Sequence, residues 1–367
     1  MNDLMLPVSG SQLENSQFLE LTNYQISVTP YFTQWLAEQQ VSLALTNTLG
    51  HSLFLIGLKP NGELAVCECK FDRCMGLTVV NSNTLYMVTR FQIWRLENAL
   101  SAGQIAETGA DRIYLPQMAY TTGVLNIHDI AVDAEGSVVF VATRFNCLAK
   151  ASTTKNFEPL WCPPFISHIM APDHCHLNGL ALHNGKLAYA SSFSQTNTHE
   201  GWRQCQRHGG TITDIATNEI VVSGLSMPHS PRVYQGQLWV AQSGTGEFGK
   251  VDIKSGKFEP IVFGAGFLRG LAFWGNFAIV GSSKPRHSDF FNDLVLGERL
   301  AAQSLEPLRG LHIIDLKAGE IIHSLSLEGV QGEIYDVVVL PGVRRPVAIS
   351  NPDDIQKYIT VGFSQSL

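Results

Sequence analysis

Charged side chains are scarce in this chain. Asp, Glu, Lys and Arg make up 16% of the 367 residues, whereas soluble proteins usually carry roughly 25%. Because 45% of the residues are hydrophobic, the chain can bury a large core, which excludes disorder as its main state. The 32 acidic residues outnumber the 25 basic ones and leave a net charge of −7. This balance argues against a general nucleic-acid-binding protein, which needs a basic face.

Long apolar runs and early positive charges are missing as well. No run approaches the roughly 18 apolar residues of a membrane span, so we expect no membrane association. The first basic residue is Lys59. Without a charged segment near the amino terminus, we expect neither a secretory signal nor a transit peptide. The seven cysteines are irregularly spaced, which is typical of reduced thiols in a cytoplasmic protein.

Several motifs of known chemistry are also missing. The chain has no Gly-x-Ser-x-Gly nucleophile elbow and no phosphate-binding glycine loop. Gly244, Gly246 and Gly249 match the glycine spacing of a dinucleotide fingerprint. A strand-like sequence rather than a helix follows them, so this spacing predicts a turn between strands and not a nucleotide site.

What the chain does contain is an internal repeat. Six short segments share one pattern. Each begins with a residue expected at the rim of a blade, continues with a small or turn-forming residue, and then has alternating apolar residues. Their starts are 39 to 66 residues apart, with a mean of 52, which fits a four-stranded propeller blade with its loops. Asp129 and Asp336 occupy the turn position that Gly fills elsewhere, and we expect them to be structural. The segments are 75–79, 128–132, 178–182, 230–234, 269–273 and 335–339.

A second strand follows each segment at a nearly constant distance, with turn-forming residues between most of the pairs. We therefore predict an all-β fold, a single six-bladed β-propeller over residues 29–367, after an N-terminal extension over residues 1–28. The sequence after the sixth repeat is too short to supply the four strands of the last blade. We expect N-terminal strands 42–46, 52–57 and 64–69 to complete it and close the ring. The second strands are predicted at 85–89, 139–143, 187–191, 238–242, 277–281 and 347–350.

Two helices are predicted among the strands. The Thr-Pro pair at 29–30 offers an N-cap and a proline at the first helical position. Phe32, Trp35 and Leu36 then lie on one face of this short N-terminal helix. A second, inserted helix is predicted over 289–303 and explains the long spacing between the fifth and sixth repeats.

The six segment starts are expected to meet at one mouth of the central channel. In an antiparallel hairpin, the start of the first strand lies beside the end of the second. The two longest insertions, 193–207 and 283–307, follow second strands and so leave from the same face, where they are expected to form a lid. Loops on a rigid scaffold commonly carry binding sites. We therefore expect a small-molecule site at this mouth.

The side chains predicted at the mouth include four arginines and four histidines but one carboxylate, Glu333. Arginine pairs well with carboxylates and phosphates, so this composition favours an anionic ligand, with a polyol as the other candidate. The equivalent repeat positions of Arg90 and Arg144 also fit a structural role. The predicted ligand-binding residues are Arg73, Arg90, Arg144, Asn178 and Arg269. The catalytic candidates are His128, His176, His229, Glu333 and Tyr335.

The densest candidate metal site is the His-Cys-His sequence at 174–176. In an extended segment, residues two apart point the same way, so His174 and His176 would share one ion. His229 would add a third ligand and leave one position open, as in catalytic zinc sites. The alternative is a pair of polar loop histidines that bind no metal. A divalent metal is thus a candidate cofactor, while the identity of any cofactor stays open.

Two levels of family resemblance apply, and the wider one rests on the segment 178–181 with the six-blade count. These residues, Asn-Gly-Leu-Ala, resemble the propellers that include gluconolactonase-like lactonases, strictosidine-synthase-like enzymes and NHL-repeat proteins. In the lactonases the corresponding asparagine is a calcium ligand, so the resemblance implies this role for Asn178 and a metal-dependent hydrolase as one function. The lactonase aspartate is absent, since the fourth blade offers His229 and Ser230.

A closer resemblance extends over nearly the whole chain and rests on the blocks 29–36, 42–46, 71–76, 126–129, 176–179, 200–203 and 227–232. Together these blocks resemble a bacterial conserved-hypothetical family of predicted six-bladed propellers. This resemblance implies the fold and brings no activity. The leading functional hypothesis is a small-molecule enzyme or binding protein for an anionic or polyol ligand. The alternative is an interaction scaffold that holds a protein partner on a propeller face.

Overall fold

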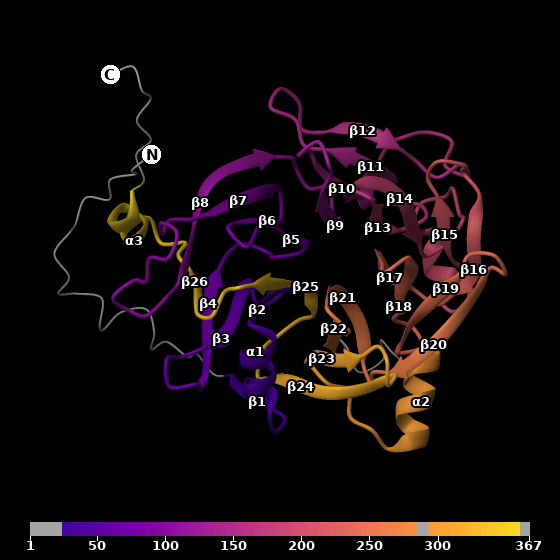
Figure 1. The fold of residues 1–367 in the computed structure, drawn as a ribbon. Helices are drawn as coiled ribbons and strands as arrows, with labels where there is room; N and C mark the ends of the chain where they lie inside the picture. The colour runs from indigo at the N-terminus through magenta and orange to yellow at the C-terminus, as the bar shows by residue number, and fades with distance from the viewer. Residues whose placement is uncertain (1–23, 285–292, 360–367) are drawn as a thin grey trace.

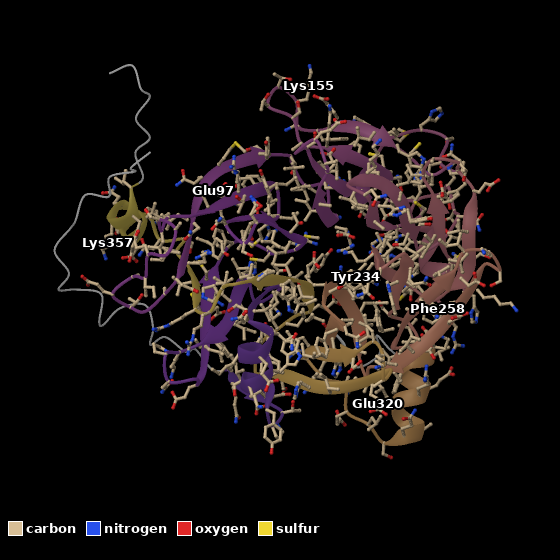
Figure 2. All side chains as sticks on the ribbon, viewed as in Figure 1. Glu97, Lys155, Tyr234, Phe258, Glu320 and Lys357 are labelled. Carbon is tan, nitrogen blue, oxygen red and sulfur yellow. The ribbon has the colours of Figure 1, made fainter. Side chains whose placement is uncertain are left out.

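The computed structural model describes residues 24–284 and 293–359, and their strands form six blades around a central channel (Figure 1). Each blade is a sheet of four antiparallel strands that run from the channel outward, and two blades carry a fifth strand. The predicted all-β, six-bladed β-propeller is confirmed. Side chains fill the space between neighbouring blades, and Tyr234 at the end of one inner strand lies toward the middle of the ring (Figure 2).

The first three blades follow one another along the chain, and the innermost strand comes first in each. The first blade contains β5 (Leu77–Val80), β6 (Thr84–Val88), β7 (Gln92–Asn98) and β8 (Arg112–Thr121). The second contains β9 (Ile127–Val132), β10 (Val138–Ala142), β11 (Cys147–Lys150) and β12 (Glu158–Trp161). The third contains β13 (Leu177–His183), β14 (Lys186–Ser192), β15 (Gly210–Asp214) and β16 (Ile220–Leu225).

The next two blades repeat this order, whereas the sixth combines both ends of the chain. The fourth contains β17 (Pro228–Tyr234), β18 (Gln237–Gln242), β19 (Glu247–Asp252) and β20 (Lys257–Phe263). The fifth contains β21 (Phe267–Trp274), β22 (Phe277–Ser283), β23 (Gly310–Asp315) and β24 (Glu320–Glu328). The sixth contains β25 (Ile334–Pro341), then β2 (Val41–Asn47), β3 (Ser52–Leu58) and β4 (Leu64–Lys70).

The ring closes through the pairing of β25 with β2. These strands are antiparallel along their whole length, with Val41 opposite Pro341 and Leu45 opposite Val337. The prediction that N-terminal strands complete the last blade is confirmed. Without β2, the backbone groups along β25 would be left as an open edge.

Two strands at the chain ends differ from the prediction. The segment predicted as the second strand of the sixth blade forms β26 (Pro346–Ala348), which pairs in parallel with β8 as the fifth strand of the first blade. β2 takes the predicted place beside β25. β1 (Gln25–Val28) pairs with β24 on the outside of the fifth blade, so the predicted boundary at residue 28 cuts off a strand of the propeller. Both additions cover outer edges beside the closing blade.

The first helix, α1 (Phe32–Gln39), begins later than predicted. Thr29 instead prolongs the pairing of β1, because its backbone N–H donates to Ser324 O at 3.0 Å and its hydroxyl accepts from Ser324 N–H at 3.1 Å. The predicted apolar face is confirmed: Phe32, Trp35 and Leu36 are buried in the core of the closing blade.

The remaining helices are short. α2 (Val295–Gln303) is the described part of the predicted inserted helix, whose residues 289–292 lie outside the described residues. The others are α3 (Pro352–Ile355) and the 3-10 turns η1 (Thr143–Phe145), η2 (Gly201–Gln204) and η3 (Gln356–Tyr358). No helix among residues 24–284 and 293–359 is long and apolar enough to cross a membrane. All seven cysteines carry free thiols.

The residue at the second repeat position of the inner strands alternates between glycine and a polar residue around the channel. The first, third and fifth blades have glycine there, and the other three have Asp129, Ser230 and Asp336. The glycines allow close approach of the next blade. A Cβ on Gly179 would lie 2.3 Å from Pro231 Cδ, and one on Gly270 would lie 2.8 Å from Asp336 Cα.

The three polar residues at this position bind the backbone of the following blade. Leu180 N–H donates to Asp129 at 3.0 Å, Gly270 N–H to Ser230 at 2.9 Å, and Leu77 N–H to Asp336 at 2.9 Å. The predicted start of the fourth repeat is therefore off by one residue. Ser230 occupies the place of the aspartates, because its Oγ accepts from the next inner strand as their carboxylates do.

A substitution of Gly270 is expected to destabilise the fold more than one of Gly236. Both glycines have positive φ, 75° and 73°, so alanine at either costs about 1–2 kcal/mol in backbone strain. At Gly236 the added methyl group meets nothing within 4 Å, whereas at Gly270 it meets backbone atoms. We expect Gly270→Ala to cost about 1–3 kcal/mol more than Gly236→Ala in the free energy of unfolding by urea. Equal losses would mean that the inner strands have room to separate.

Candidate functional site

The first residues of the six repeats form a ring at one end of the channel. Within it, the Arg269 guanidinium lies 3.5 Å from the centre of the Tyr335 ring, and Tyr335 lies 5.7 Å from His128. Asn178, Arg269 and Tyr335 are buried, with 2%, 4% and 3% of their surfaces exposed. We call this set the polar ring; it consists of Met75, His128, Asn178, His229, Arg269 and Tyr335. The structure thus brings together two predicted ligand-binding residues and three of the catalytic candidates.

Two histidines of the polar ring are held in the same way. His128 Nδ1 lies 2.7 Å from Asn126 O and 2.9 Å from Thr143 Oγ1. His229 Nδ1 lies 3.0 Å from a backbone carbonyl and 2.7 Å from Ser243 Oγ. Since a carbonyl oxygen only accepts, Nδ1 carries the proton in both rings and Nε2 is the basic nitrogen.

His128 is held neutral by its surroundings. Burial lowers its pKa well below the ordinary value, and the neighbouring His176 and Arg269 act in the same direction. Near pH 7 its Nε2 therefore offers a lone pair. In this state His128 accepts a hydrogen bond from a ligand hydroxyl.

Hydroxyl groups at the ends of second strands lock the polar ring to the next blade. Thr143 Oγ1 donates to Leu177 O at 2.7 Å, and Ser243 makes the corresponding bond to Leu268 O. In the closing blade, Thr46 Oγ1 donates to Met75 O at 2.5 Å. Because the Thr143 and Ser243 hydroxyls donate to carbonyls, they accept from the histidine Nδ1–H groups and fix the histidine tautomer. Thr46 Oγ1 accepts from the Asp336 backbone N–H instead.

The single positive charge of the polar ring is neutralised by a buried carboxylate. Arg269 Nη1 lies 2.8 Å from Glu333 Oε2, and both side chains are almost completely buried. Two donors of the polar ring have no protein acceptor within the described residues: Arg269 Nε and Asn178 Nδ2. A buried donor without an acceptor costs about 1–3 kcal/mol, so such atoms indicate where a ligand or water binds.

The two insertions cover the polar ring. The His176 ring lies 4.5 Å from Phe193 and 4.3 Å from Trp202 of the first insertion. Leu296 and Leu300 of α2 belong to the same buried cluster as these aromatic residues. The described parts of both insertions thus form the predicted cover over the mouth.

Of the four predicted arginines, only Arg269 lies in the buried ring. Arg90 is about half exposed and pairs with Asp72, with bonds of 2.8 and 3.1 Å. Arg144 is exposed, and Arg73 is half-buried with its backbone N–H bound to a histidine. The expectation that four arginines meet at one mouth with Glu333 as the one carboxylate is therefore wrong. Asp72 balances one arginine, and solvent surrounds another.

The three-histidine metal site is not assembled. His176 has a φ of 52°, so its segment is not extended and the argument from alternating side chains fails. His176 Nδ1 binds Asp173 at 2.6 Å, and His174 Nδ1 lies 3.3 Å from Asn197. Among the residues that the structure describes, no group of three or more His, Cys, Asp or Glu side chains is placed to hold a metal ion.

An ion cluster that the sequence analysis missed crosses the channel below the polar ring. Arg232 of the fourth blade binds both carboxylate oxygens of Asp129 in the second, at 2.7 and 2.9 Å. Its guanidinium also lies 4.0 Å from Asp336 of the sixth blade. We call these three residues the central cluster. The signal in the sequence is an arginine at the third position of the predicted segment 230–234, where the other five segments have Leu, Ile or Val.

The electrostatics of the central cluster predict a pH dependence of stability. Burial raises the pKa of Asp336 to about 7, with Asp129 acting in the same direction and Arg232 opposing, whereas an unfolded aspartate has a pKa of about 3.9. The folded protein thus holds an extra proton between about pH 4 and 7, and its free energy of unfolding falls as the pH rises through this window.

We expect the protein to lose more stability between pH 5 and 8 than its Asp336→Asn variant, in urea unfolding at each pH. The comparison cancels the contribution of His128, whose lowered pKa acts in the opposite direction. Parallel curves for the two proteins would show that Asp336 is already ionised at pH 5.

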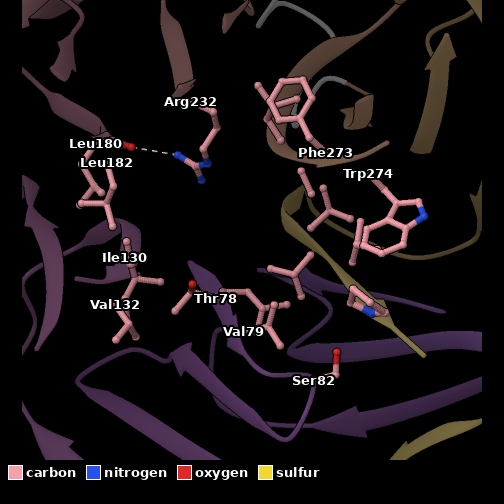
Figure 3. Close-up of a pocket in the computed structure, with 18 of the residues that line it drawn as sticks. Thr78, Val79, Ser82, Ile130, Val132, Leu180, Leu182, Arg232, Phe273 and Trp274 are labelled. Carbon is pink, nitrogen blue, oxygen red and sulfur yellow. Dashed lines mark hydrogen bonds between the residues drawn. The ribbon is translucent and has the colours of Figure 1, made fainter. Parts of the chain in front are cut away.

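Below the central cluster the channel opens into a cavity of about 520 Å³ (Figure 3). Its wall comes from the second halves of the inner strands and is mostly apolar. In Figure 3, Leu180 and Leu182 face Phe273 and Trp274 across the space, and Arg232 enters from the fourth blade. We call this space the channel cavity. The central cluster separates it from the polar ring.

Comparison with known proteins places this geometry in a family without adding an activity. A family model described as "Domain of unknown function (DUF4915)" matches residues 30–349. None of the curated proteins compared matches the chain.

Among solved structures, the chain is similar to one in a crystal structure of a nidogen/laminin complex, with a TM-score of 0.52, 11% identity and coverage of 83% of this chain and 99% of that one. It is also similar to a protein of unknown function from Bacteroides caccae, with a TM-score of 0.52, 12% identity and coverage of 82% and 98%. At these identities the likeness shows the propeller fold alone.

Proposed function

The chain belongs to the family described as a domain of unknown function (DUF4915), and from its own residues we propose that it binds a small, uncharged, polyhydroxylated molecule at the polar ring. The observation that carries this proposal is the pair of buried donors without a protein acceptor, Asn178 Nδ2 and Arg269 Nε. His128 Nε2 supplies an acceptor in the same ring. A polyol fits this mixture, because each hydroxyl both donates and accepts.

The charge balance favours an uncharged ligand over an anion. Glu333 neutralises Arg269, and burial keeps His128 neutral. An anion would add a net charge to a buried site, at a cost that only a free cation would offset. A deprotonated carboxylate group also cannot donate a hydrogen bond to His128 Nε2, whereas a hydroxyl group can.

The enclosure of the polar ring favours a small molecule over a protein partner. An interaction scaffold predicts a flat apolar surface and an open channel. Here Phe193, Trp202 and α2 pack over buried polar groups. The proposal concerns binding, because a lowered pKa makes His128 a hydrogen-bond acceptor rather than a proton carrier near pH 7.

Isothermal titration calorimetry with matched ligands tests the proposal. The panel pairs neutral polyols with charged relatives of similar size: glucose with gluconate and glucose 6-phosphate, and myo-inositol with inositol phosphates. We expect saturable binding of at least one neutral polyol and at least tenfold weaker binding of its charged relatives. Tighter binding of a charged member would identify an anion site, and no saturable binding of any member would overturn the proposal.

A variant at Asn178 separates binding from folding. Asn178→Ala removes a donor that has no protein partner, so we expect binding to weaken at least tenfold while the unfolding temperature does not fall. The control is Asn156→Ala on the outside of the second blade, where the side chain bonds Thr121 O and is exposed. Binding that is unchanged in Asn178→Ala would contradict the placement of the ligand.

A further inference from the structure

The channel cavity has the dimensions and wall of a ligand site distinct from the polar ring. Its volume of about 520 Å³ lies within the roughly 300–1,000 Å³ of small-molecule sites. The wall is built from Val, Ile and Leu side chains, with Phe273 and Trp274 on one side. Apart from Asn81 and Ser82 in the turn after β5, the lining residues lie on inner strands, so the sheets hold most of the wall in place.

One strongly polar side chain enters this apolar space. The Arg232 side chain is 22% exposed, whereas the carboxylates of Asp129 and Asp336 behind it are 4% exposed. The cavity therefore faces the guanidinium and not its counter-ions. Figure 3 shows the group reaching from the fourth blade into the cavity, with a bond to the Leu180 carbonyl.

The hydrogen bonds of Arg232 leave donors for a ligand. A guanidinium carries five N–H groups. Nη1 is satisfied by Asp129, Leu180 O and Pro231 O, and Nη2 spends one N–H on Asp129. Within the described residues, the second Nη2 N–H has only Asp336 nearby, at 4.0 Å. This second Nη2 N–H calls for an oxygen acceptor at the floor of the cavity.

The charge of the central cluster determines which chemical group of a ligand supplies the acceptor oxygen. Asp129 already balances Arg232, and Asp336 adds further negative charge when it is ionised. A carboxylate ligand would thus enter a site whose net charge is zero or negative, while an ammonium group would meet N–H donors. An uncharged carbonyl oxygen accepts from Arg232 without adding charge.

We propose that the channel cavity binds an uncharged, largely apolar small molecule whose single carbonyl oxygen accepts a hydrogen bond from Arg232. The apolar wall buries the hydrocarbon part of the molecule, and the guanidinium fixes the orientation of its carbonyl group. This site goes beyond the function proposed for the polar ring. The two sites share no residue, and the central cluster lies between them.

Three probes with one chain length test the head group: octanamide, octanoate and octylammonium. We expect octanamide to bind saturably in calorimetry, and the two charged probes to bind at least tenfold more weakly. A preference for octanoate or for octylammonium would overturn the assignment of a neutral head. No saturable binding of any of the three would overturn the site.

Variants of one type locate the binding. Leu182→Trp adds bulk inside the cavity and is expected to weaken octanamide binding at least tenfold. Leu160→Trp places the same change on β12, where Leu160 is exposed, and should leave binding unchanged. Equal effects of the two variants would overturn the location.

Two further variants keep the test independent of folding and of the polar ring. Arg232→Lys retains the positive charge but loses the planar guanidinium with its several N–H donors. We therefore expect weaker octanamide binding in a protein that still unfolds cooperatively. Binding that is insensitive to this change would refute the carbonyl contact. Asn178→Ala should leave octanamide binding intact, so that failure at one site is distinguishable from failure at the other.

Discussion

Replacing Asp129 with alanine is expected to lower the free energy of unfolding by about 3–5 kcal/mol, the usual loss when one partner of a buried ion pair is removed. Asp129 accepts from Arg232 through both oxygens and also from the backbone of Ile130 and Leu180. Its loss leaves the Arg232 guanidinium in the channel with Asp336, at 4.0 Å, as its remaining ion-pair partner among the described residues. Urea unfolding of the full chain measures the effect.

Asp133→Ala is the matched control for this prediction. Asp133 lies on the same hairpin and accepts two backbone hydrogen bonds, at 2.9 and 2.8 Å, without the buried arginine. We expect its loss to cost about 1–2 kcal/mol. A double variant, Asp129→Ala with Arg232→Met, should be more stable than Asp129→Ala alone, because it removes the uncompensated charge. Equal losses in the two single variants would show that the ion pair adds nothing beyond its backbone bonds.

The ring of inner strands could be predicted because each blade repeats the same local pattern. The starts of the repeats and the turns after them follow from alternating apolar residues and from Gly, Asn and Asp between them. The closing strands could be predicted by counting, since the last blade needs partners that only the amino-terminal region offers. The positions of His128, Asn178 and Arg269 at one mouth follow directly from the repeat.

The partners of these side chains could not be predicted from the repeat. Arg232 and Asp129 are 103 residues apart, and their contact depends on the width of the channel and the length of the arginine. His176 lies in a left-handed conformation that no periodicity reveals. β26 joins the first blade because that outer edge is open, and an edge accepts any strand that reaches it.

The alternation of the blades explains why the channel has two different ends. Every other blade has histidine or tyrosine at the first repeat position and Asp or Ser at the second. The blades between them have glycine at the second position. The polar side chains therefore cluster at two levels, the polar ring and the central cluster. Beyond that level the inner strands present apolar residues, which leaves the channel cavity with Arg232 as its strongly polar floor.

Removal of residues 1–58 is expected to abolish cooperative unfolding. The deletion takes away β1, α1, β2 and β3, and it leaves β25 without its neighbour. Leu43, Leu45, Phe54 and Ile56 are completely buried, and each buried side chain of this kind contributes about 1.5–3 kcal/mol. Four such losses alone approach the roughly 5–15 kcal/mol that stabilises a typical protein. Calorimetry of the truncated chain should show no cooperative transition, and its near-ultraviolet circular dichroism should be lost.

Removal of residues 1–23 is the control, because it leaves every described strand and helix in place. We expect this shorter deletion to unfold within a few degrees of the full chain. The contrast tests the closure itself, since loss of β2 and β3 separates β25 from β4 and uncovers the faces of the first and fifth blades that pack against the sixth. If the chain that begins at residue 59 melts cooperatively near the temperature of the control, the sixth blade is not needed to hold the ring. The pairing of β2 with β25 would then contribute little to stability.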